Sequence, residues 1–199
     1  MLLWARLEEA FQEAVRLKSR FVVEQGQEVL KGARLLAETL QGGGKALIFG
    51  NGGSAADAQH FAAELVNRFQ VERPPLAAIA LTTDTSVLTS IANDYDFQEV
   101  FAKQVRALGR PGDLAIGITT SGASANVVRA LKAAQEEGLK TMVLTGGAGG
   151  PVTDGVDVAI IVPSRVTPRI QEVHITVIHL LCDLVDYLLF PEKFADQRG

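Results

Sequence analysis

Four polar side chains stand at spacings that could support metal binding or proton transfer. His60 and Glu64 are four residues apart in a stretch with helical periodicity, so they share one helix face. Gln171 and His179 are eight residues apart in a second such stretch, which brings them within about 80° of each other around the helix axis. Imidazole, carboxylate and amide groups can together coordinate a divalent metal such as zinc. They can also move protons, because histidine titrates near neutral pH and burial raises the pKa of a glutamate toward it.

The same residues also have an ordinary structural explanation. His60 and Glu64 could be an i,i+4 pair on a solvated helix face, and Gln171 could be a surface residue. His174 is the remaining histidine, and it is offset from His179 by about 140° around the helix. We therefore expect His174 to be a core or interface residue outside any such site.

Two loops rich in glycine and hydroxyl groups could bind a phosphate. Residues 50–54 read GNGGS; glycines let the backbone approach a ligand closely, and the following helix offers free N–H groups to an anion. Residues 119–124 read TTSGAS, so four hydroxyl groups surround one glycine at the start of a predicted helix. Alternatively, Ser124 is only the N-cap of that helix and the hydroxyls fill a turn.

The first loop also matches a loose dinucleotide-binding pattern, Gly50-x-Gly52-x-x-Ala55. Asp84 follows the next predicted strand, but it lies farther on than the roughly 20 residues expected for the acid that binds ribose. A dinucleotide site would also leave the second loop without a role. The P-loop pattern is absent from the sequence, because neither loop is followed by Gly-Lys-Ser/Thr.

Apolar runs alternate with helical patterns along the chain. Strands are predicted at residues 46–49, 76–81, 114–118, 141–144 and 156–162. Helices are predicted at about 5–24, 27–40, from the first loop to 69, 83–92, 97–108, from the second loop to 137, and 168–190. This alternation predicts an α/β fold with a parallel sheet covered by helices on both faces. Ligands of such sheets bind beyond the carboxyl ends of the strands, where both loops lie.

Composition limits the class of protein. The 199 residues fit a single domain, 1–199, with an N-terminal helical extension over about 1–42. A net charge of -4 argues against direct nucleic-acid binding. Cys182 is the only cysteine, which excludes an intramolecular disulfide and fits a reducing compartment. The sequence shows no secretory signal and no apolar stretch near the roughly 18 residues of a membrane span, so we expect a cytoplasmic protein without a membrane partner.

The segments that carry these polar residues resemble the sedoheptulose-7-phosphate isomerase (phosphoheptose isomerase) family of SIS-domain proteins. The matching segments are residues 50–54, 58–65, 93–94, 119–127 and 169–179. The resemblance covers almost the whole chain and is specific in combination. It implies a three-layer αβα sandwich of flavodoxin-like type with a parallel sheet, preceded by two N-terminal helices. It also implies a homotetramer with active sites between subunits.

The resemblance further implies conversion of D-sedoheptulose 7-phosphate to D-glycero-D-manno-heptose 7-phosphate through an enediolate, a step in heptose biosynthesis for bacterial surface glycans. It assigns proton transfer to Glu64 and His179, and one zinc ion per subunit to His60, Glu64, Gln171 and His179. We expect Glu64 to shuttle the proton and His179 to serve the substrate oxygens, with zinc as a Lewis acid. The positions that match substrate-binding residues are Asn51, Gly52, Gly53, Ser54, Glu64, Asn93, Asp94, Thr119, Thr120, Ser121, Ser124 and Gln171.

Two departures keep alternatives open. Pro168 stands where these isomerases tend to have aspartate, which puts one sugar contact in doubt. Residues 67–74 and 101–109 look closer to the DnaA initiator-associating protein, a non-enzymatic SIS tetramer that binds the replication initiator. That relative lacks the glutamate and the final histidine that are Glu64 and His179 here, so their presence favours an enzyme. A module that senses a sugar phosphate is a third alternative.

Overall fold

The computed structural model describes residues 1–198 and contains a five-stranded, fully parallel sheet in the order β2-β1-β3-β4-β5. Every residue of the two strands β1 and β3 is buried, as continuous apolar strands between two helix layers must be. This strand order is the flavodoxin-like one, so the predicted three-layer α/β fold is confirmed. The strands are β1 (Ala46–Gly50), β2 (Ala78–Ala80), β3 (Leu114–Ile118), β4 (Lys140–Gly146) and β5 (Val158–Val162).

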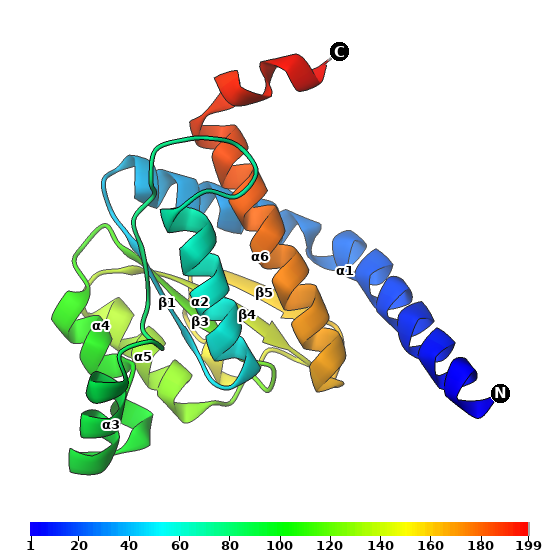
Figure 1. Cartoon of the computed structure of the whole chain (residues 1–199). Coiled ribbons are helices and arrows are strands. Elements are labelled where there is room, and N and C mark those ends of the chain that lie inside the picture. The colour runs from blue at the N-terminus through cyan, green and yellow to red at the C-terminus, as the bar shows by residue number, and fades with distance from the viewer. Residues whose placement is uncertain (199) are drawn as a thin grey trace.

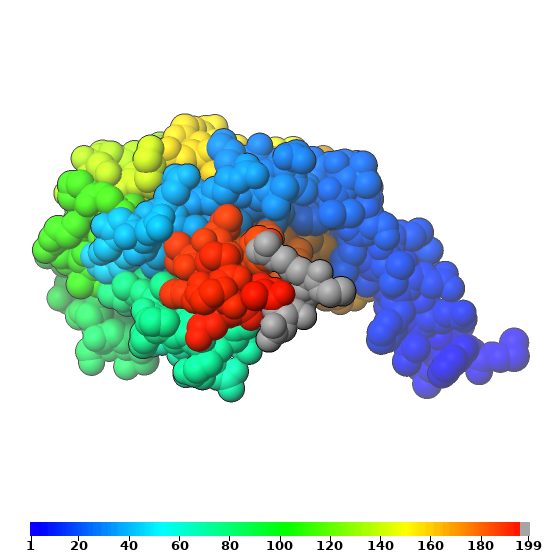
Figure 2. Space-filling model, turned by 90° about the horizontal axis from the view of Figure 1, so that it is seen from above, coloured from blue at the N-terminus to red at the C-terminus, as the bar shows by residue number. Residues whose placement is uncertain are grey.

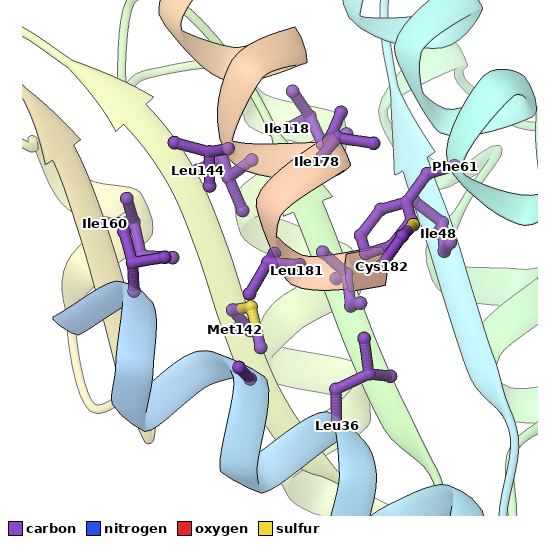
Figure 3. Close-up of a cluster of buried hydrophobic side chains, with 14 of the residues drawn as sticks. Leu36, Ile48, Phe61, Ile118, Met142, Leu144, Ile160, Ile178, Leu181 and Cys182 are labelled. Atoms are coloured by element: carbon purple, nitrogen blue, oxygen red, sulfur yellow. The ribbon is translucent and has the colours of Figure 1, made fainter. Parts of the chain in front are cut away.

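The helices form two layers, one on each face of the sheet (Figure 1). One layer holds α1 (Leu2–Gln41), α2 (Gly53–Val66) and α6 (Thr167–Leu189), and the other holds α3 (Thr85–Asp94), α4 (Ala102–Leu108) and α5 (Ala125–Glu136). Alternate residues of a strand serve the two layers, because successive side chains point to opposite faces. In the first layer, Leu36, Phe61 and Ile178 pack over Ile48 and Leu144 of the sheet (Figure 3).

The N-terminal region differs from the prediction of two helices, which is wrong. α1 is one continuous helix of 40 residues that passes through Gly26. A single helical glycine costs only about 1 kcal/mol relative to alanine, and burial of residues such as Phe21 and Val29 on either side of it outweighs that cost. The predicted helix over 97–108 is instead a short 3-10 turn, η1 (Phe97–Glu99), followed by α4.

The first turns of α1 project from the body of the protein (Figure 2). Burial on this helix begins at Leu17, and the apolar side chains of Trp4, Leu7, Phe11 and Val15 before it are exposed. This part of the helix therefore has an apolar stripe that its own chain does not cover. Within residues 1–198, no helix has both the length and the apolarity required to cross a membrane.

The topology brings the two glycine-containing loops together. Gly50 at the end of β1 is paired with Ile118 at the end of β3, so the two loops leave adjacent strands at the same level. The helices that follow them, α2 and α5, go to opposite faces of the sheet. A crevice forms at such a switch point, and ligands of doubly wound sheets bind there.

Candidate active site

Three of the candidate residues meet where α2 packs on α6. The Nε2 atoms of His60 and His179 are 3.0 Å apart, and His60 Nε2 lies 3.4 Å from Glu64 Oε1. The Phe69 ring stacks on His179 with the ring centroids 5.4 Å apart, which holds that imidazole from one side. The side chains of His60 and Glu64 keep 43% and 23% of their accessible surface, so the cluster can be reached by a solute.

Gln171 lies about two helical turns before His179 and faces the start of α2. A Cβ atom on Gly53 would come within 2.3 Å of Gln171 Nε2, so glycine here permits the two helices to approach. The contact of Gly53 with Gln171 and that of His60 with His179 show that α2 and α6 lie side by side. We call these two helices, aligned in this way, the α2–α6 pair. Among the described residues, no hydrogen bond joins Gln171 to the His60–Glu64–His179 cluster.

The hydroxyl loop, residues 119–124, folds its side chains onto one another. Thr119 Oγ1 lies 2.9 Å from Ser124 Oγ and 3.4 Å from Ser121 Oγ. Ser124 occupies the N-cap position of α5, but its side chain makes no capping hydrogen bond. Val127 N–H donates to the carbonyl oxygen of Ser124, but the N–H groups of Ala125 and Asn126 have no acceptor in the described part of the chain, so they stay available to an anion at this helix N-terminus.

A cavity of about 240 Å³ opens between the hydroxyl loop, the first loop and the start of α6. It joins predicted substrate-binding residues of the two loops to Gln171, so the structure brings most of the predicted phosphate and sugar contacts to one place. Thr167 was not predicted, because its position in the first turn of α6 becomes meaningful only once that helix is placed beside the loops. The lining residues are Asn51, Ser54, Ile118, Thr119, Thr120, Ser121, Ser124, Thr167 and Gln171.

Asn126 is a further residue of this region that the sequence did not reveal. Its side-chain amide and that of Asn51 donate to each other's carbonyl oxygens, with both distances at 2.8 Å. Asn126 is buried, and the reciprocal pair ties the first loop to the first turn of α5. The pair fixes the width of the crevice between the two loops.

Two predicted sugar contacts lie elsewhere in the single chain. Asn93 and Asp94 end α3, are exposed, and hydrogen bond to each other at 2.8 Å. No described contact links them to the cavity or to the histidines. Pro168 lies in the first turn of α6, where proline is well tolerated because the N–H it lacks has no intrahelical partner there.

The third histidine is a core residue, as predicted. His174 is fully buried, and its Nε2 lies 3.2 Å from the carbonyl oxygen of Thr145. Burial lowers the pKa of His174 to about 4, although the hydrogen bond to Thr145 acts in the opposite direction. The imidazole is therefore neutral at pH 7 and donates its Nε2–H to that carbonyl.

Asp57 was missed, although it stands one helical turn before His60 on α2. Its Oδ2 atom is buried and has no hydrogen-bond partner in the described part of the chain. Burial raises the pKa of Asp57, and the charge of His60 opposes that rise. The three-residue spacing from His60 was the available signal, since it places both side chains on one helix face.

The donor atoms of the cluster fit zinc in type and partly in position. Two imidazole nitrogens bound to one tetrahedral zinc at 2.0–2.1 Å would lie about 3.3 Å apart, close to the 3.0 Å between His60 Nε2 and His179 Nε2. Glu64 supplies an oxygen donor beside His60. Within residues 1–198, however, no group of three or more His, Cys, Asp or Glu side chains converges closely enough to hold a metal. As they stand, the described side chains therefore offer the paired imidazoles but not a complete three-ligand site.

Comparison with known proteins identifies close relatives over almost the whole chain. A SIS domain family model matches residues 10–146. The phosphoheptose isomerase of Thermodesulfovibrio yellowstonii is 54% identical over 193 residues, which cover 97% of this chain and 96% of that protein. The solved phosphoheptose isomerase of Neisseria gonorrhoeae is 48% identical with a TM-score of 0.85, and covers 92% of this chain and 98% of its own. That of Francisella tularensis is 39% identical with a TM-score of 0.90, with coverages of 94% and 99%.

More distant structures share only the fold. The sugar isomerase domain of an RpiR transcription factor from Sphaerobacter thermophilus is 19% identical with a TM-score of 0.62, and covers 96% of this chain and 94% of its own. Identity at that level does not support the sensor alternative. None of these relatives favours the initiator-binding alternative suggested by residues 67–74 and 101–109.

Proposed function

This chain belongs to the phosphoheptose isomerase family of SIS-domain proteins, and we propose that it converts D-sedoheptulose 7-phosphate to D-glycero-D-manno-heptose 7-phosphate. One observation carries the proposal: the His60–Glu64–His179 cluster lies on the same two helices whose first turns border the hydroxyl cavity. The eight residues from Gln171 to His179 span about 12 Å along α6. An open-chain heptose phosphate can extend over that length, with its phosphate in the cavity and C1 and C2 at the cluster.

The reaction moves a proton between C1 and C2 and passes through an enediolate. The hydroxyl loop and the N-terminus of α5 hold the phosphate with neutral donors, which anchors the sugar relative to the two helices. Glu64 takes the proton from one carbon and returns it to the other. His179 serves the substrate oxygens on which negative charge develops, and Phe69 keeps its ring in place.

Zinc is proposed as the cofactor, one ion per subunit, held by His60, Glu64 and His179, with Gln171 as a further donor whose side chain would turn from the hydroxyl cavity toward the cluster. When bound, it would supply Lewis-acid stabilisation of the substrate oxygens. The 3.0 Å approach of the two Nε2 atoms supports this assignment. Elemental analysis of the purified protein should find about one zinc per chain, and the His60→Ala variant should lose most of it. The His174→Phe variant is the control, because His174 is buried on the other side of α6, and it should retain the metal.

The activity is tested with purified protein and sedoheptulose 7-phosphate, with aldose formation followed by NMR. Glu64→Gln should lower kcat by at least about 100-fold, the range in which general acid–base catalysis contributes. Glu72→Gln is the matched control, since Glu72 is a highly exposed glutamate whose ion pair with Arg68 lies on the surface, and it should keep full activity. A Glu64→Gln variant as active as Glu72→Gln would contradict the assignment of the proton to Glu64.

A homotetramer is proposed as the assembly. The exposed apolar stripe Trp4, Leu7, Phe11 and Val15 on the projecting part of α1 supports association with other copies of the chain. Light scattering after size exclusion should give four times the 21.3 kDa chain mass, whereas a monomer would contradict the proposal. A cytoplasmic location is also proposed, and the buried free thiol of Cys182 is consistent with a reducing compartment.

A further inference from the structure

A buried guanidinium closes the α2–α6 pair at the end away from the hydroxyl cavity. The Arg73 side chain is fully buried, and its Nε donates to Asp186 Oδ1 at 2.8 Å. Its Nη2 donates to the carbonyl oxygen of Glu64 at 2.8 Å, and its Nη1 to that of Leu65 at 2.7 Å. Two more carbonyl oxygens lie near Nη1, that of Pro74 at 3.2 Å and that of Asn67 at 3.3 Å.

These contacts stabilise the C-terminal end of α2. The last carbonyl groups of a helix have no intrahelical donors, and a positive charge beside them is favoured by the helix dipole. α2 ends at Val66, and its C-cap residue Asn67 is not a left-handed glycine cap. Arg73 takes the place of such a cap, because the loop after α2 folds back past the C-terminal part of α6 (Figure 1).

Asp186 connects the capped end of α2 to α6. It stands seven residues after His179, so the two side chains lie within about 20° of each other around the helix axis. Arg73 therefore joins the turn of α2 that bears Glu64 to the face of α6 that bears His179. Gly53 with Gln171, His60 with His179, and Arg73 with Asp186 are three successive contacts along the α2–α6 pair.

We propose that Arg73 and Asp186 are positioning residues for the isomerase reaction, which set the distance and orientation of Glu64 relative to His179. The inference rests on the proposed function. Neither residue lines the hydroxyl cavity or contacts the histidines, so both act through the backbone of the two helices.

Stability alone is a poor explanation for this ion pair. A buried pair contributes little net stability compared with apolar side chains of similar volume, because both charges must be desolvated. Here the cost is increased further, since Asp186 Oδ2 is buried without a hydrogen-bond partner in the described part of the chain. The Arg73–Asp186 pair does supply a fixed geometry. The planar guanidinium is bound by the Asp186 carboxylate and four backbone carbonyl oxygens, and this set of hydrogen bonds fixes where the last turn of α2 lies relative to α6.

The test compares Arg73→Lys with a matched ion pair outside the site. Lysine keeps the charge but cannot reproduce the fork of donors. The control is Asp113→Asn, because Asp113 is buried, pairs with Lys45 Nζ at 2.5 Å, and lies just before the central strand β3, outside the α2–α6 pair. We expect Arg73→Lys to lower kcat by about 10- to 100-fold, since a misplacement of 1 Å can cost that much. KM should change less than threefold, because the phosphate cavity is untouched. Asp113→Asn should lower the Tm while keeping kcat.

A second readout does not depend on turnover. The ring 1H and 15N signals of His60 and His179 should shift in Arg73→Lys, whereas those of His174, buried on the same helix, should not. The Asp186→Asn variant keeps the Oδ1 acceptor, so its His60 and His179 signals should shift in the same direction but by less. If Arg73→Lys does not fold, Asp186→Asn takes its place in the comparison.

Two results would overturn the proposal. One is that the His60 and His179 signals do not shift. The other is that Arg73→Lys and Asp113→Asn have equal kcat when their losses of Tm are equal. An inactive wild-type protein would instead count against the proposed function, and the NMR comparison would still decide the positioning role.

Discussion

His174 should make the stability of the protein depend on pH in a defined direction. Its folded-state pKa of about 4 lies below the ordinary value of 6.5, so the unfolded chain binds the proton more tightly. The contribution of His174 to stability is therefore fully present above pH 6.5 and is lost as the pH falls toward 4. A shift of 2.5 pKa units at 1.36 kcal/mol each amounts to about 3 kcal/mol, most of it lost by pH 4.5.

Urea unfolding of the wild type and of His174→Phe at pH 7.5 and pH 4.5 measures this contribution. Both proteins should be compared at one protein concentration and with chelator present, so that assembly and metal binding do not differ. The loss of the Nε2–H bond to Thr145 lowers the stability of the variant at both pH values and cancels in the comparison. We expect the wild type to lose about 2–3 kcal/mol more than the variant between the two pH values. Equal losses would refute the assignment of a buried, neutral imidazole.

Two further predictions concern the loops at the cavity. Gly122→Ala should lower the free energy of unfolding in urea far more than Gly43→Ala. Both glycines have positive φ, but only at Gly122 would a Cβ atom clash, because it would lie 1.7 Å from the carbonyl oxygen of Gly149. Equal destabilisation would show that the clash is relieved. Ser124→Ala should raise KM about tenfold with less than about 1 kcal/mol loss of stability, because its hydroxyl pairs with Thr119 instead of capping α5. A loss of stability with unchanged KM would restore the simple N-cap explanation.

Most of the fold could be predicted from the sequence because its strands are short apolar runs bounded by glycine-rich loops. The prediction failed where tertiary packing decides the outcome. Separate helices were predicted at about 5–24 and 27–40, but the packed residues on both sides of Gly26 keep α1 continuous. The strand predicted at 76–81 is only Ala78–Ala80, because β2 is an edge strand that pairs with β1 alone.

The candidate site could be predicted where spacing on one helix determines the geometry. His60 with Glu64 met that condition, and the meeting with His179 followed from the packing of α2 on α6. Contacts between distant segments could not be predicted in this way. Asn126 and Arg73 look like ordinary polar residues in the sequence, and only the fold brings each of them to a partner 75 or 113 positions away.

The central claim is that this chain isomerises a heptose phosphate by proton transfer. The most direct measurement is 1H NMR of sedoheptulose 7-phosphate with the zinc-supplemented wild-type protein in D2O. The proposed mechanism predicts growth of the aldose product, with deuterium at C2 because the proton carried by Glu64 exchanges with solvent. A folded, metal-loaded protein that forms no aldose would contradict the claim.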